Sequence, residues 1–346
     1  MNYLINNVNY SEGALFEKSK SMLIGLEVPT WEKRIWQFIL EWIDKSTESF
    51  IQESSGSTGI AKKIEIKKKY AVESARKTIL YFGLKEGQTI HLCMHPSYIG
   101  AKMIIVRAFV GGLNLSYSEA SSNALNLVKH SVDLCAAVPL QVFGLLEQNK
   151  AGNPFIKNVL IGGGVIPSTL VSKIQNQQTK YYQSFGMTET ISHIAIRDLG
   201  NDDTSYHCLE GISVSTDILD NCLIVHAPEL GVEHLKTNDN VNLINETSFE
   251  WLGRDDNVIN SGGIKIHPEK IEKLIENLIK NPYYISSIAD EKLGNRIVLY
   301  IASNDLLDKN ALLLQLRPLL PSHHLPKEII IESIFEYTPT GKIIRK

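Results

Sequence analysis

The stretch from residue 54 to residue 63 concentrates glycine, hydroxyl and lysine side chains in a pattern suited to binding a polyphosphate. Glycine allows the backbone to turn several N–H groups toward one point, where an anion can approach closely. Hydroxyl groups add hydrogen-bond donors, and lysine adds a positive charge. The residues that we expect to take part are Ser54, Ser55, Gly56, Ser57, Thr58, Gly59 and Lys62. The stretch is not a Walker loop, because Lys62 lies three residues after Gly59, and a polar surface loop is the alternative.

A second group of residues suited to a site runs from Gln183 to Thr190. It places a glycine, hydroxyl groups and one carboxylate at the end of a predicted strand over residues 181–185. The carboxylate of Glu189 could hold a hard cation, because such ions prefer oxygen ligands. The alternative is a carboxylate that stabilises the start of a helix through the helix dipole.

Charged residues stand beside glycine or in polar loops at three further places. Asp239 and Arg254 lie in loop-like stretches, where an acid can accept hydrogen bonds from ribose hydroxyls; a surface ion pair is the alternative. Gly262 and Gly263 indicate a tight turn, which many folds need for structure alone. Lys342 follows a glycine near the C-terminus, where a lysine is usually exposed and has no function.

The composition is that of an ordinary soluble globular protein, with 346 residues, 43% of them hydrophobic and 21% charged. A formal net charge of -3 gives no indication of nucleic acid or an anionic membrane as a partner. Four scattered cysteines argue against a zinc ribbon or a disulfide framework and favour a reducing compartment. Because the sequence shows neither a signal-peptide pattern nor an apolar run of membrane-spanning length, we expect a cytoplasmic protein.

Apolar runs alternate with helical patterns from residue 62 to residue 186. This alternation predicts βαβ units and a largely parallel sheet, whose ligands bind beyond the ends of the strands. The predicted strands are 62–66, 89–94, 131–138, 159–161 and 181–185, and the predicted helices are 70–83, 99–110, 139–148 and one that Pro167 begins. An amphipathic helix also follows Thr30, and we expect residues 1–30 to be a loosely structured lead-in.

The pattern changes after Arg197, where short alternating strands at 212–219, 222–227 and 241–244 predict a β-rich subdomain. A small α/β unit follows, with helices at 268–280 and 311–317 and strands at 296–302 and 328–332. We therefore expect an α/β protein. Its large N-terminal domain should cover residues 1–255, with the β-rich subdomain at about 198–255, and a small C-terminal domain should cover 256–346.

Taken together and in order, these stretches resemble the adenylate-forming superfamily of acyl-CoA synthetases, adenylation domains and luciferases. The phosphate loop of that superfamily is similar to Ser54 to Lys62, and its Tyr-Gly-x-Thr-Glu motif is similar to Phe185 to Glu189. Its Thr-Gly-Asp, Gly-Arg-x-Asp, Gly-Gly-x-Lys-Ile and terminal Pro-x-x-Gly-Lys motifs are similar to residues 237–239, 253–256, 262–266 and 339–342. The resemblance extends from about residue 50 to the end, and the set is highly specific.

The chain departs from the superfamily pattern at several positions. Ala61 replaces the loop proline, Phe185 replaces a tyrosine that stacks on adenine, and Asn238 replaces a glycine. Only 53 residues precede the phosphate loop, fewer than is usual in the superfamily, which indicates a compact enzyme with a shortened N-terminal subdomain. With its segment 101–108 after a Pro-Ser-Tyr-Ile-Gly turn, the chain looks most like the compact o-succinylbenzoate–CoA ligases of menaquinone biosynthesis.

The resemblance implies an enzyme that uses ATP and Mg²⁺ to convert a carboxylate into an acyl-adenylate, releases pyrophosphate, and transfers the acyl group to CoA. Lys342 would bridge the attacking carboxylate and the α-phosphate, Thr188 would approach the α-phosphate, and Glu189 would help to hold Mg²⁺. The implied nucleotide ligands are the residues of the phosphate loop, with Gly163, Gly164, Ser184, Phe185, Gly186 and Met187 around adenine and Asp239 and Arg254 at the ribose.

The same resemblance implies that the C-terminal domain is mobile. Asp256 occupies the position of the hinge. After adenylation, a rotation about it would withdraw Lys342 and turn the loop that contains Gly262, Gly263 and Lys265 toward the active site for thioester formation.

The acyl pocket implied by the resemblance includes Tyr98, Arg107 and His193. A carboxylate substrate that is an aromatic dicarboxylate needs one cation for its spare carboxylate, and Arg107 and His193 are the candidates. An ordinary structural arginine is the alternative for Arg107. We expect no nucleic acid and no membrane as a partner. A homodimer is compatible with the sequence.

Other functions stay open at this point. Within the enzyme class, the chain could be a ligase for another aryl or medium-chain acid, or an adenylation enzyme that loads a carrier protein. Outside that class, it could be a nucleotide-binding regulator that performs no chemistry. The presence of both Glu189 and Lys342 argues against the regulator.

Overall fold

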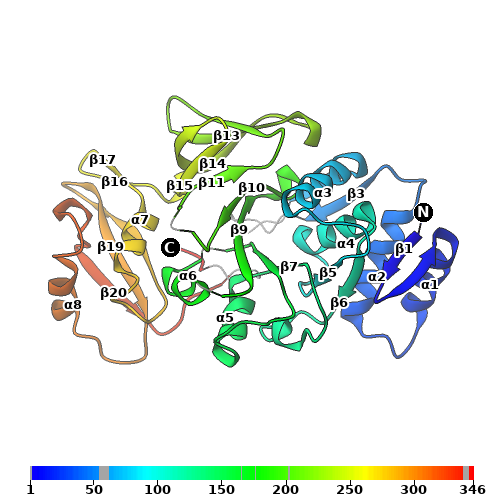
Figure 1. Cartoon of the computed structure of the whole chain (residues 1–346). Helices are drawn as coiled ribbons and strands as arrows, with labels where there is room; N and C mark the ends of the chain where they lie inside the picture. The colour runs from blue at the N-terminus through cyan, green and yellow to red at the C-terminus, as the bar shows by residue number, and fades with distance from the viewer. Residues whose placement is uncertain (1, 54–61, 165, 176, 202, 338–342) are drawn as a thin grey trace. The chain divides into compact units, whose positions relative to one another are not determined.

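Figure 1 shows the computed structural model, which describes residues 2–53, 62–164, 166–175, 177–201, 203–337 and 343–346. The chain forms two compact units. The first contains residues 1–166, 170–213 and 226–234, and the second contains residues 167–169, 214–225 and 235–346. The second unit takes in residues on both sides of Asp256, and the predicted domain division between residues 255 and 256 stays a prediction.

A sheet with parallel central strands forms the core of the first unit, in the strand order β11-β10-β9-β8-β7-β5-β6-β1-β2. The strands from β9 to β1 in this order run parallel to their neighbours, as the βαβ pattern predicted. Strands β10, β11 and β2 pair antiparallel. The bounds are β1 Asn2–Ile5, β2 Val8–Ser11, β5 Thr89–Leu92, β6 Asn114–Tyr117, β7 Leu134–Ala137, β8 Asn158–Ile161, β9 Lys180–Gly186, β10 His193–Asp198 and β11 Tyr206–Cys208.

The helices of this part of the chain lie close to the positions that the apolar periodicity predicted, except α1, which lies where no helix was expected. They are α1 Glu12–Ile24, α2 Thr30–Ile43, α3 Lys68–Phe82, α4 Ile99–Gly111, α5 Pro139–Gln148 and α6 Ser168–Ile174, with short 3-10 turns η1 Ala124–Leu127, η2 Thr188–Thr190 and η3 Pro228–Leu230. Helix α3 ends at Gly83, whose left-handed backbone (φ 59°) closes the last turn.

Residues 2–24 form two strands and a helix, so the expectation of a loosely structured lead-in over 1–30 was wrong. Asn6 and Asn7 both have positive φ (48° and 64°), which is the geometry of a two-residue hairpin turn between β1 and β2. Ser11 then caps α1, because its hydroxyl accepts a hydrogen bond from the N–H of Ala14 at 3.3 Å. The polar composition gave no indication of this hairpin, whose turn is favoured because asparagine adopts positive φ more readily than most residues.

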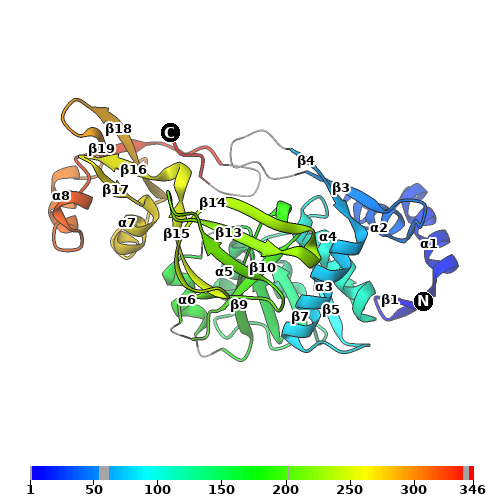
Figure 2. The ribbon, with the colours of Figure 1, turned by 90° about the horizontal axis from the view of Figure 1, so that it is seen from above.

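A separate two-stranded antiparallel ribbon, β3 Ser49–Glu53 and β4 Lys63–Lys67, flanks the predicted phosphate loop (Figure 2). It packs on α2, where the ring of Phe50 meets Phe38 and Trp42 at centroid distances of 5.2 and 6.2 Å. The ammonium of Lys68 donates to the carbonyl oxygens of Glu41 and Asp44 at 2.8 and 2.6 Å. One lysine of the charge run at 67–69 therefore caps the C-terminal end of α2.

The second unit contains most of the β-rich part, where β14 and β15 pair antiparallel, and a smaller α/β sheet with the order β17-β16-β19-β18, in which β20 pairs parallel with β19. Isoleucine and leucine side chains of α7, β18, β19 and β20 form the core of that smaller sheet. The bounds are β12 Ser213–Thr216, β13 Cys222–Ala227, β14 Val232–Asn245, β15 Ser248–Arg254, η4 Asp255–Asn257, β16 Ile259–Ser261, β17 Ile264–Ile266, α7 Pro268–Ile275, β18 Tyr283–Asp290, β19 Gly294–Ala302, α8 Lys309–Leu316, η5 Ser322–His324 and β20 Glu328–Glu332.

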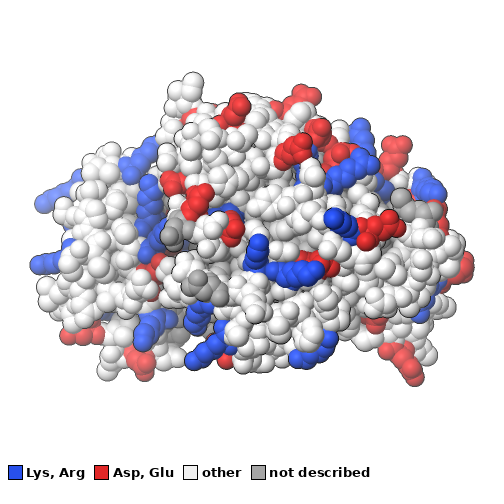
Figure 3. Space-filling model, viewed as in Figure 1, with Lys and Arg blue, Asp and Glu red and all other residues white. Residues whose placement is uncertain are grey.

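The surface carries both signs of charge. Figure 3 shows lysine and arginine side chains interspersed with aspartate and glutamate on the face that it presents. Among the residues that the structure describes, none of the helices is long and apolar enough to cross a bilayer.

Candidate active site

The first part of the candidate site lies at the carboxyl ends of β8 and β9, which are parallel neighbours. Gly163 follows β8 with a positive φ of 79°, and Gly163 is exposed. The hydroxyl of Ser184 in β9 donates to the carbonyl oxygen of Ile161 at 3.0 Å. A side chain on Gly162 would meet that hydroxyl, since an added Cβ would lie 2.7 Å from it. The structure therefore brings Ser184 next to the glycine stretch that contains Gly163 and Gly164, as a shared nucleotide site requires.

A tight turn after β9 sets the positions of Thr188 and Glu189. Thr190 is buried, and its hydroxyl accepts from the N–H of Met187 and donates to the carbonyl oxygen of Ser192, at 3.0 and 2.7 Å. Ile191 has a positive φ of 67°, which is rare for a β-branched residue and indicates a constrained turn. Sequence reasoning included Thr190 in the motif but did not assign it a role; its role here is to hold the turn.

Gly186 is needed because β10 approaches it closely. A Cβ at this position would lie 2.3 Å from the carbonyl oxygen of Ser192 and 2.5 Å from the Cα of His193. The adjacent ring of Phe185 makes an edge contact with Tyr206 at a centroid distance of 5.5 Å. Glu189 is exposed, so its carboxylate can meet a ligand from solvent. An accessible carboxylate of this kind suits Mg²⁺, which proteins usually hold through one or two carboxylates together with substrate phosphates.

Arg107 and His193, two candidates for the acyl pocket, lie together in the core of the first unit. A guanidinium nitrogen of Arg107 donates to Ser192 Oγ at 2.8 Å and lies 3.4 Å from His193 Nδ1. The other ring nitrogen of His193 lies 3.2 Å from Thr78 Oγ1. Burial lowers the pKa of Arg107 to about 9, and burial with the Arg107 charge lowers the pKa of His193 well below its ordinary value. His193 is therefore neutral, and Arg107 carries the charge of the network.

Among the residues that the structure describes, no carboxylate neutralises the charge of Arg107. The side chain is 2% exposed, its Nε has no hydrogen-bond partner, and among the described residues no aspartate or glutamate forms an ion pair with it. Buried charges are normally paired, which makes this guanidinium a candidate for an anionic ligand. Tyr98, the third acyl candidate, begins α4 and therefore lies about 13 Å from Arg107 along the helix.

A hollow of about 440 Å³ opens beyond the carboxyl ends of β5 and β6. Sequence reasoning did not find it, because its walls come from distant segments of the chain. Trp31 and Arg34 of α2 line one side, and His95 lines the other. The full set of lining residues is Thr30, Trp31, Arg34, Met94, His95, Pro96, Ser118, Glu119 and Ala120.

The second part of the candidate site lies in the second unit, where β14 pairs with β15. Asp239 and Arg254 are directly opposite in the antiparallel register, and their charged atoms lie 4.0 Å apart. The carboxylate of Asp239 also accepts from the indole N–H of Trp251 at 2.9 Å. Arg254 contacts Asp256 at 2.5 Å. The structure therefore brings together the two predicted ribose ligands and the predicted hinge residue, and it adds Trp251, which the motif did not include.

The other predicted residues of the second unit lie in the β16–β17 hairpin and at the C-terminus. Gly262 and Gly263 form the two-residue turn of that hairpin with φ values of 60° and 80°, and Lys265 is exposed. Lys342 and the phosphate-loop residues Ser54 to Gly59 lie outside the described residues, whereas Lys62 is described and exposed just before β4.

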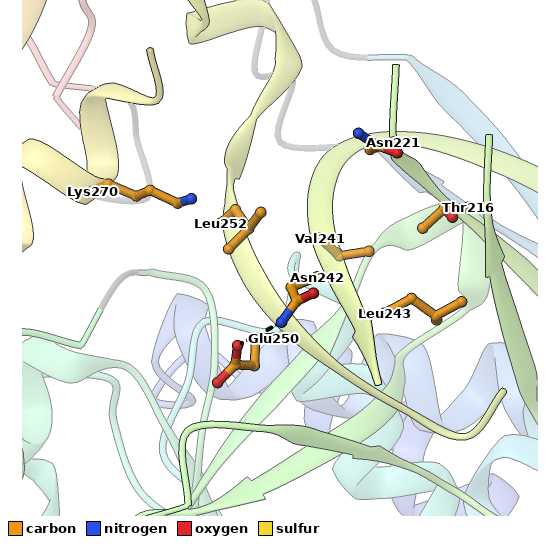
Figure 4. Close-up of a pocket in the computed structure, with 8 residues that line it drawn as sticks. All are labelled: Thr216, Asn221, Val241, Asn242, Leu243, Glu250, Leu252 and Lys270. Carbon is orange, nitrogen blue, oxygen red and sulfur yellow. Dashed lines mark hydrogen bonds between the residues drawn. The ribbon is translucent and has the colours of Figure 1, made fainter. Parts of the chain in front are cut away.

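A second hollow, of about 480 Å³, lies on the β-rich part of the second unit (Figure 4). Side chains of β12, β14 and β15 line it together with Asn221 and with Lys270 of α7, and Asn242 donates to Glu250 at 3.0 Å. None of the predicted nucleotide ligands lines it. Nearby, Asp220, Cys222 and Asp255 have potential ligand atoms within 4.8 Å of one another, but the ammonium of Lys236 already pairs with Asp220 at 2.7 Å.

Comparison with known proteins assigns the chain to a family. The family model described as AMP-binding enzyme matches residues 14–220, which is more than half of the chain. The chain belongs to the AMP-binding enzyme family. The resemblance to the adenylate-forming superfamily that the sequence motifs indicated is therefore confirmed.

Relatives of this AMP-binding protein have names from one class of ligase. A 2-succinylbenzoate–CoA ligase of Listeria monocytogenes is 27% identical over 334 residues, which cover 89% of this chain and 71% of the relative. An acyl-CoA synthetase (AMP-forming)/AMP-acid ligase II-like protein of Dyadobacter fermentans has a similar structure, with 28% identity, a TM-score of 0.63 and 96% of each chain covered.

A structure of the o-succinylbenzoate CoA synthetase of Bacillus subtilis with its acyl-adenylate intermediate gives a TM-score of 0.78. It is 20% identical to the AMP-binding protein described here, and the match covers 85% of this chain and 67% of the other. The expected fold class, that of the adenylate-forming enzymes, is confirmed. The roles of individual site residues stay predictions, including the convergence of the two parts of the site.

Proposed function

We propose that this AMP-binding enzyme is an ATP-dependent acid–CoA ligase that acts on o-succinylbenzoate. The observation that carries this proposal is the complete ordered set of adenylate-forming motifs in a chain whose relatives are named 2-succinylbenzoate–CoA ligases. The reaction would give an acyl-adenylate and pyrophosphate first, and the thiol of CoA would then displace AMP. ATP and CoA are substrates in this proposal, and Mg²⁺ accompanies ATP.

The physical difficulty of the first step is that a carboxylate must attack the α-phosphorus of a polyanion. Positive groups and N–H donors that face the developing charge lower this barrier. In this chain Lys62 and the loop before it would bind the β- and γ-phosphates, Thr188 would donate to the α-phosphate, and Lys342 would bridge the two reacting anions. Mg²⁺, held in part by Glu189, would supply further positive charge to the phosphates.

Two groups of residues would hold adenosine. Gly163, Gly164 and the segment from Ser184 to Met187 would enclose adenine, with the ring of Phe185 available for stacking. The carboxylate of Asp239, oriented by Trp251, would accept hydrogen bonds from ribose hydroxyls beside Arg254. Before the second step, rotation about Asp256 would withdraw Lys342 from the active site. The hairpin that contains Gly262, Gly263 and Lys265 would take its place.

The specificity for a dicarboxylate would depend on Arg107. Its guanidinium is buried and pairs with no carboxylate among the described residues, so a substrate carboxylate would supply the missing counter-ion. Ser192 and His193 would hold the guanidinium in place. Tyr98 would line the pocket nearer to the start of α4.

Acid-dependent exchange of labelled pyrophosphate into ATP tests this proposal. We expect o-succinylbenzoate to support exchange far better than benzoate, medium-chain acids or amino acids. Exchange that is fastest with another acid would favour a ligase of different specificity, and transfer to a carrier protein instead of CoA would favour an adenylation enzyme. No exchange with any acid would favour a nucleotide-binding regulator. Size-exclusion chromatography of the same protein would test for a homodimer.

A further inference from the structure

Two glutamates of α7 face the C-terminal segment of the chain. The guanidinium of Arg345 forms a bidentate ion pair with Glu272, with N–O distances of 2.6 and 2.9 Å. Arg345 also donates to the carbonyl oxygen of Ile285 at 2.9 Å, and the N–H of Ile285 donates to Glu272 at 2.6 Å. Bidentate arginine–carboxylate pairs fix direction as well as distance. The pair therefore fixes residue 345 to α7 and β18 in a defined orientation.

Glu269, one turn earlier on α7, connects the same arginine with the predicted hinge. Its carboxylate lies 3.5 Å from Arg345 and accepts from the amide of Asn257 at 2.6 Å. Asn257 directly follows Asp256 in the sequence. The Glu269 side chain is only 8% exposed, so water does not screen these contacts strongly.

The same carboxylate approaches the chain on the other side of Asp256. A Cβ on Gly253 would lie 2.5 Å from Glu269 Oε2, and Gly253 has a φ of 148°, which favours glycine. Glu269 Oε2 is buried and has no hydrogen-bond partner among the described residues. Glu269 is therefore in close contact with Gly253 before the predicted hinge residue, with Asn257 after it, and with Arg345.

The residues next to Arg345 are held as well. Ile343 forms an antiparallel bridge with Tyr337, and the N–H of Ile344 donates to the carbonyl oxygen of Glu336 at 2.9 Å. Ile343 directly follows Lys342 in the sequence. The described segment 343–345 is thus the fixed attachment of the predicted catalytic lysine to the second unit.

We propose that Glu272 and Glu269, acting through Arg345, are positioning residues that fix the attachment of Lys342 relative to the hinge turn. This inference rests on the proposed function, because it assigns to Lys342 the first half of the ligase reaction. A displacement of about 1 Å in a reacting group can reduce a rate by about 100-fold. Loss of the pair therefore slows adenylation, in which Lys342 acts, and spares thioester formation, in which it does not.

The test compares the two half-reactions in Glu272→Gln and Arg345→Met with those of the wild type. We expect adenylation of o-succinylbenzoate to fall by about 10- to 100-fold while thioester formation from supplied acyl-adenylate changes by less than about threefold. The control is Arg296→Met, which removes an arginine–glutamate pair at Glu328 on the same sheet and should leave both rates unchanged. A double variant of Glu272 and Arg345 should be no slower than Arg345→Met alone, because both changes remove one interaction.

Trypsin cleavage after Lys342 gives a readout that does not depend on activity. Loss of residues 343–346 from the chain, followed by intact mass and counted whether or not Lys346 has first been removed by cleavage after Arg345, should be several-fold faster in Glu272→Gln than in the wild type, with Arg296→Met unchanged. Equal loss of both half-reactions, or release at the wild-type rate, would overturn the positioning role. A wild type that does not adenylate o-succinylbenzoate would instead refute the proposed substrate, and the trypsin rates alone would then decide the inference.

Discussion

At the scale of single residues, the buried guanidinium of Arg107 is the most informative side chain of the first unit. Its contacts with Ser192 and His193 bring no negative charge, and His193 is neutral because burial and Arg107 depress its pKa. A protein gains little stability from a buried, unpaired charge, so a function in binding an anion accounts for its presence better than a structural function.

Replacing Arg107 should therefore separate dicarboxylate from monocarboxylate substrates. In Arg107→Leu we expect KM for o-succinylbenzoate to rise by about 10- to 100-fold, because the second carboxylate loses a charged hydrogen-bond partner. KM for an aryl acid without a second carboxylate should change little. Arg107→Lys, which keeps the charge without the bidentate geometry, serves as the control. Steady-state adenylation rates provide the measurement, and an unchanged KM for the dicarboxylate would remove this role.

His91 should make stability dependent on pH. Its ring contacts Ser116 and Ser118, and burial, with a smaller effect of His130, lowers the pKa of His91 to about 4. Because the folded pKa lies below the unfolded value of about 6.5, the contribution is complete above pH 6.5 and is lost as the pH falls toward 4. The difference between the pKa of His91 in the unfolded and folded states corresponds to about 3 kcal/mol of stability.

Urea unfolding of wild type and His91→Gln between pH 7.5 and pH 4.5 would measure this contribution. The variant should be less stable at the higher pH, because glutamine fits the two serines less well. Its free energy of unfolding should then fall less steeply with acid than that of the wild type. Parallel pH curves for the two proteins would show that His91 titrates normally in the folded state.

At the scale of elements, the close passage of β9 and β10 gives the sharpest prediction. Ala at position 186 would place a methyl group 2.3 Å from a backbone oxygen, so the strands must shift at the bulge that precedes Ala195. We expect Gly186→Ala to destabilise the protein by about 1–3 kcal/mol, as overpacked sites do. Gly13→Ala is a suitable control, since nothing lies within 4 Å of its added methyl group. Chemical denaturation of the two variants would distinguish them, and equal stability would contradict the account of this turn.

The elements also show how much of the fold the sequence predicts. Periodicity located α2, α3, α4 and α5 almost to the residue, because each has an apolar face or a clear end signal such as Gly83. It did not predict β18 at Tyr283–Asp290, where serines and an alanine interrupt the apolar pattern and the pairing with β19 determines the strand. The N-terminal hairpin was missed for a similar reason, since the asparagine turn has meaning only once β1 pairs with β6.

For the candidate site, too, some residues could be predicted from the sequence and others could not. Motif order named Ser184, Glu189, Asp239 and Arg254 as candidates, since spacing along the chain is visible in a sequence. The partners that orient them were not found: Thr190 for the turn, Trp251 for Asp239, and Glu269 between hinge and tail. Each of these depends on a contact between segments that are brought together only by folding, and no local pattern marks such a contact.

At the scale of the whole molecule, the account requires Lys342 to act in only one of two half-reactions. Lys342→Ala should reduce adenylation by at least about 100-fold, since it removes a charge that stabilises the transition state. Thioester formation from supplied acyl-adenylate should largely survive. Rapid-quench measurement of the two steps would check this, with Lys346→Ala as a control for the loss of a neighbouring C-terminal lysine. Equal loss of both steps would refute the proposed rotation of the C-terminal domain about Asp256.

The most direct test of the central claim is to incubate the purified wild-type protein with o-succinylbenzoate, ATP, Mg²⁺ and CoA, and to identify the products by mass. The account predicts o-succinylbenzoyl-CoA together with equal amounts of AMP and pyrophosphate. Formation of ADP in place of AMP, or no thioester from a folded protein that forms one with a different acid, would contradict it.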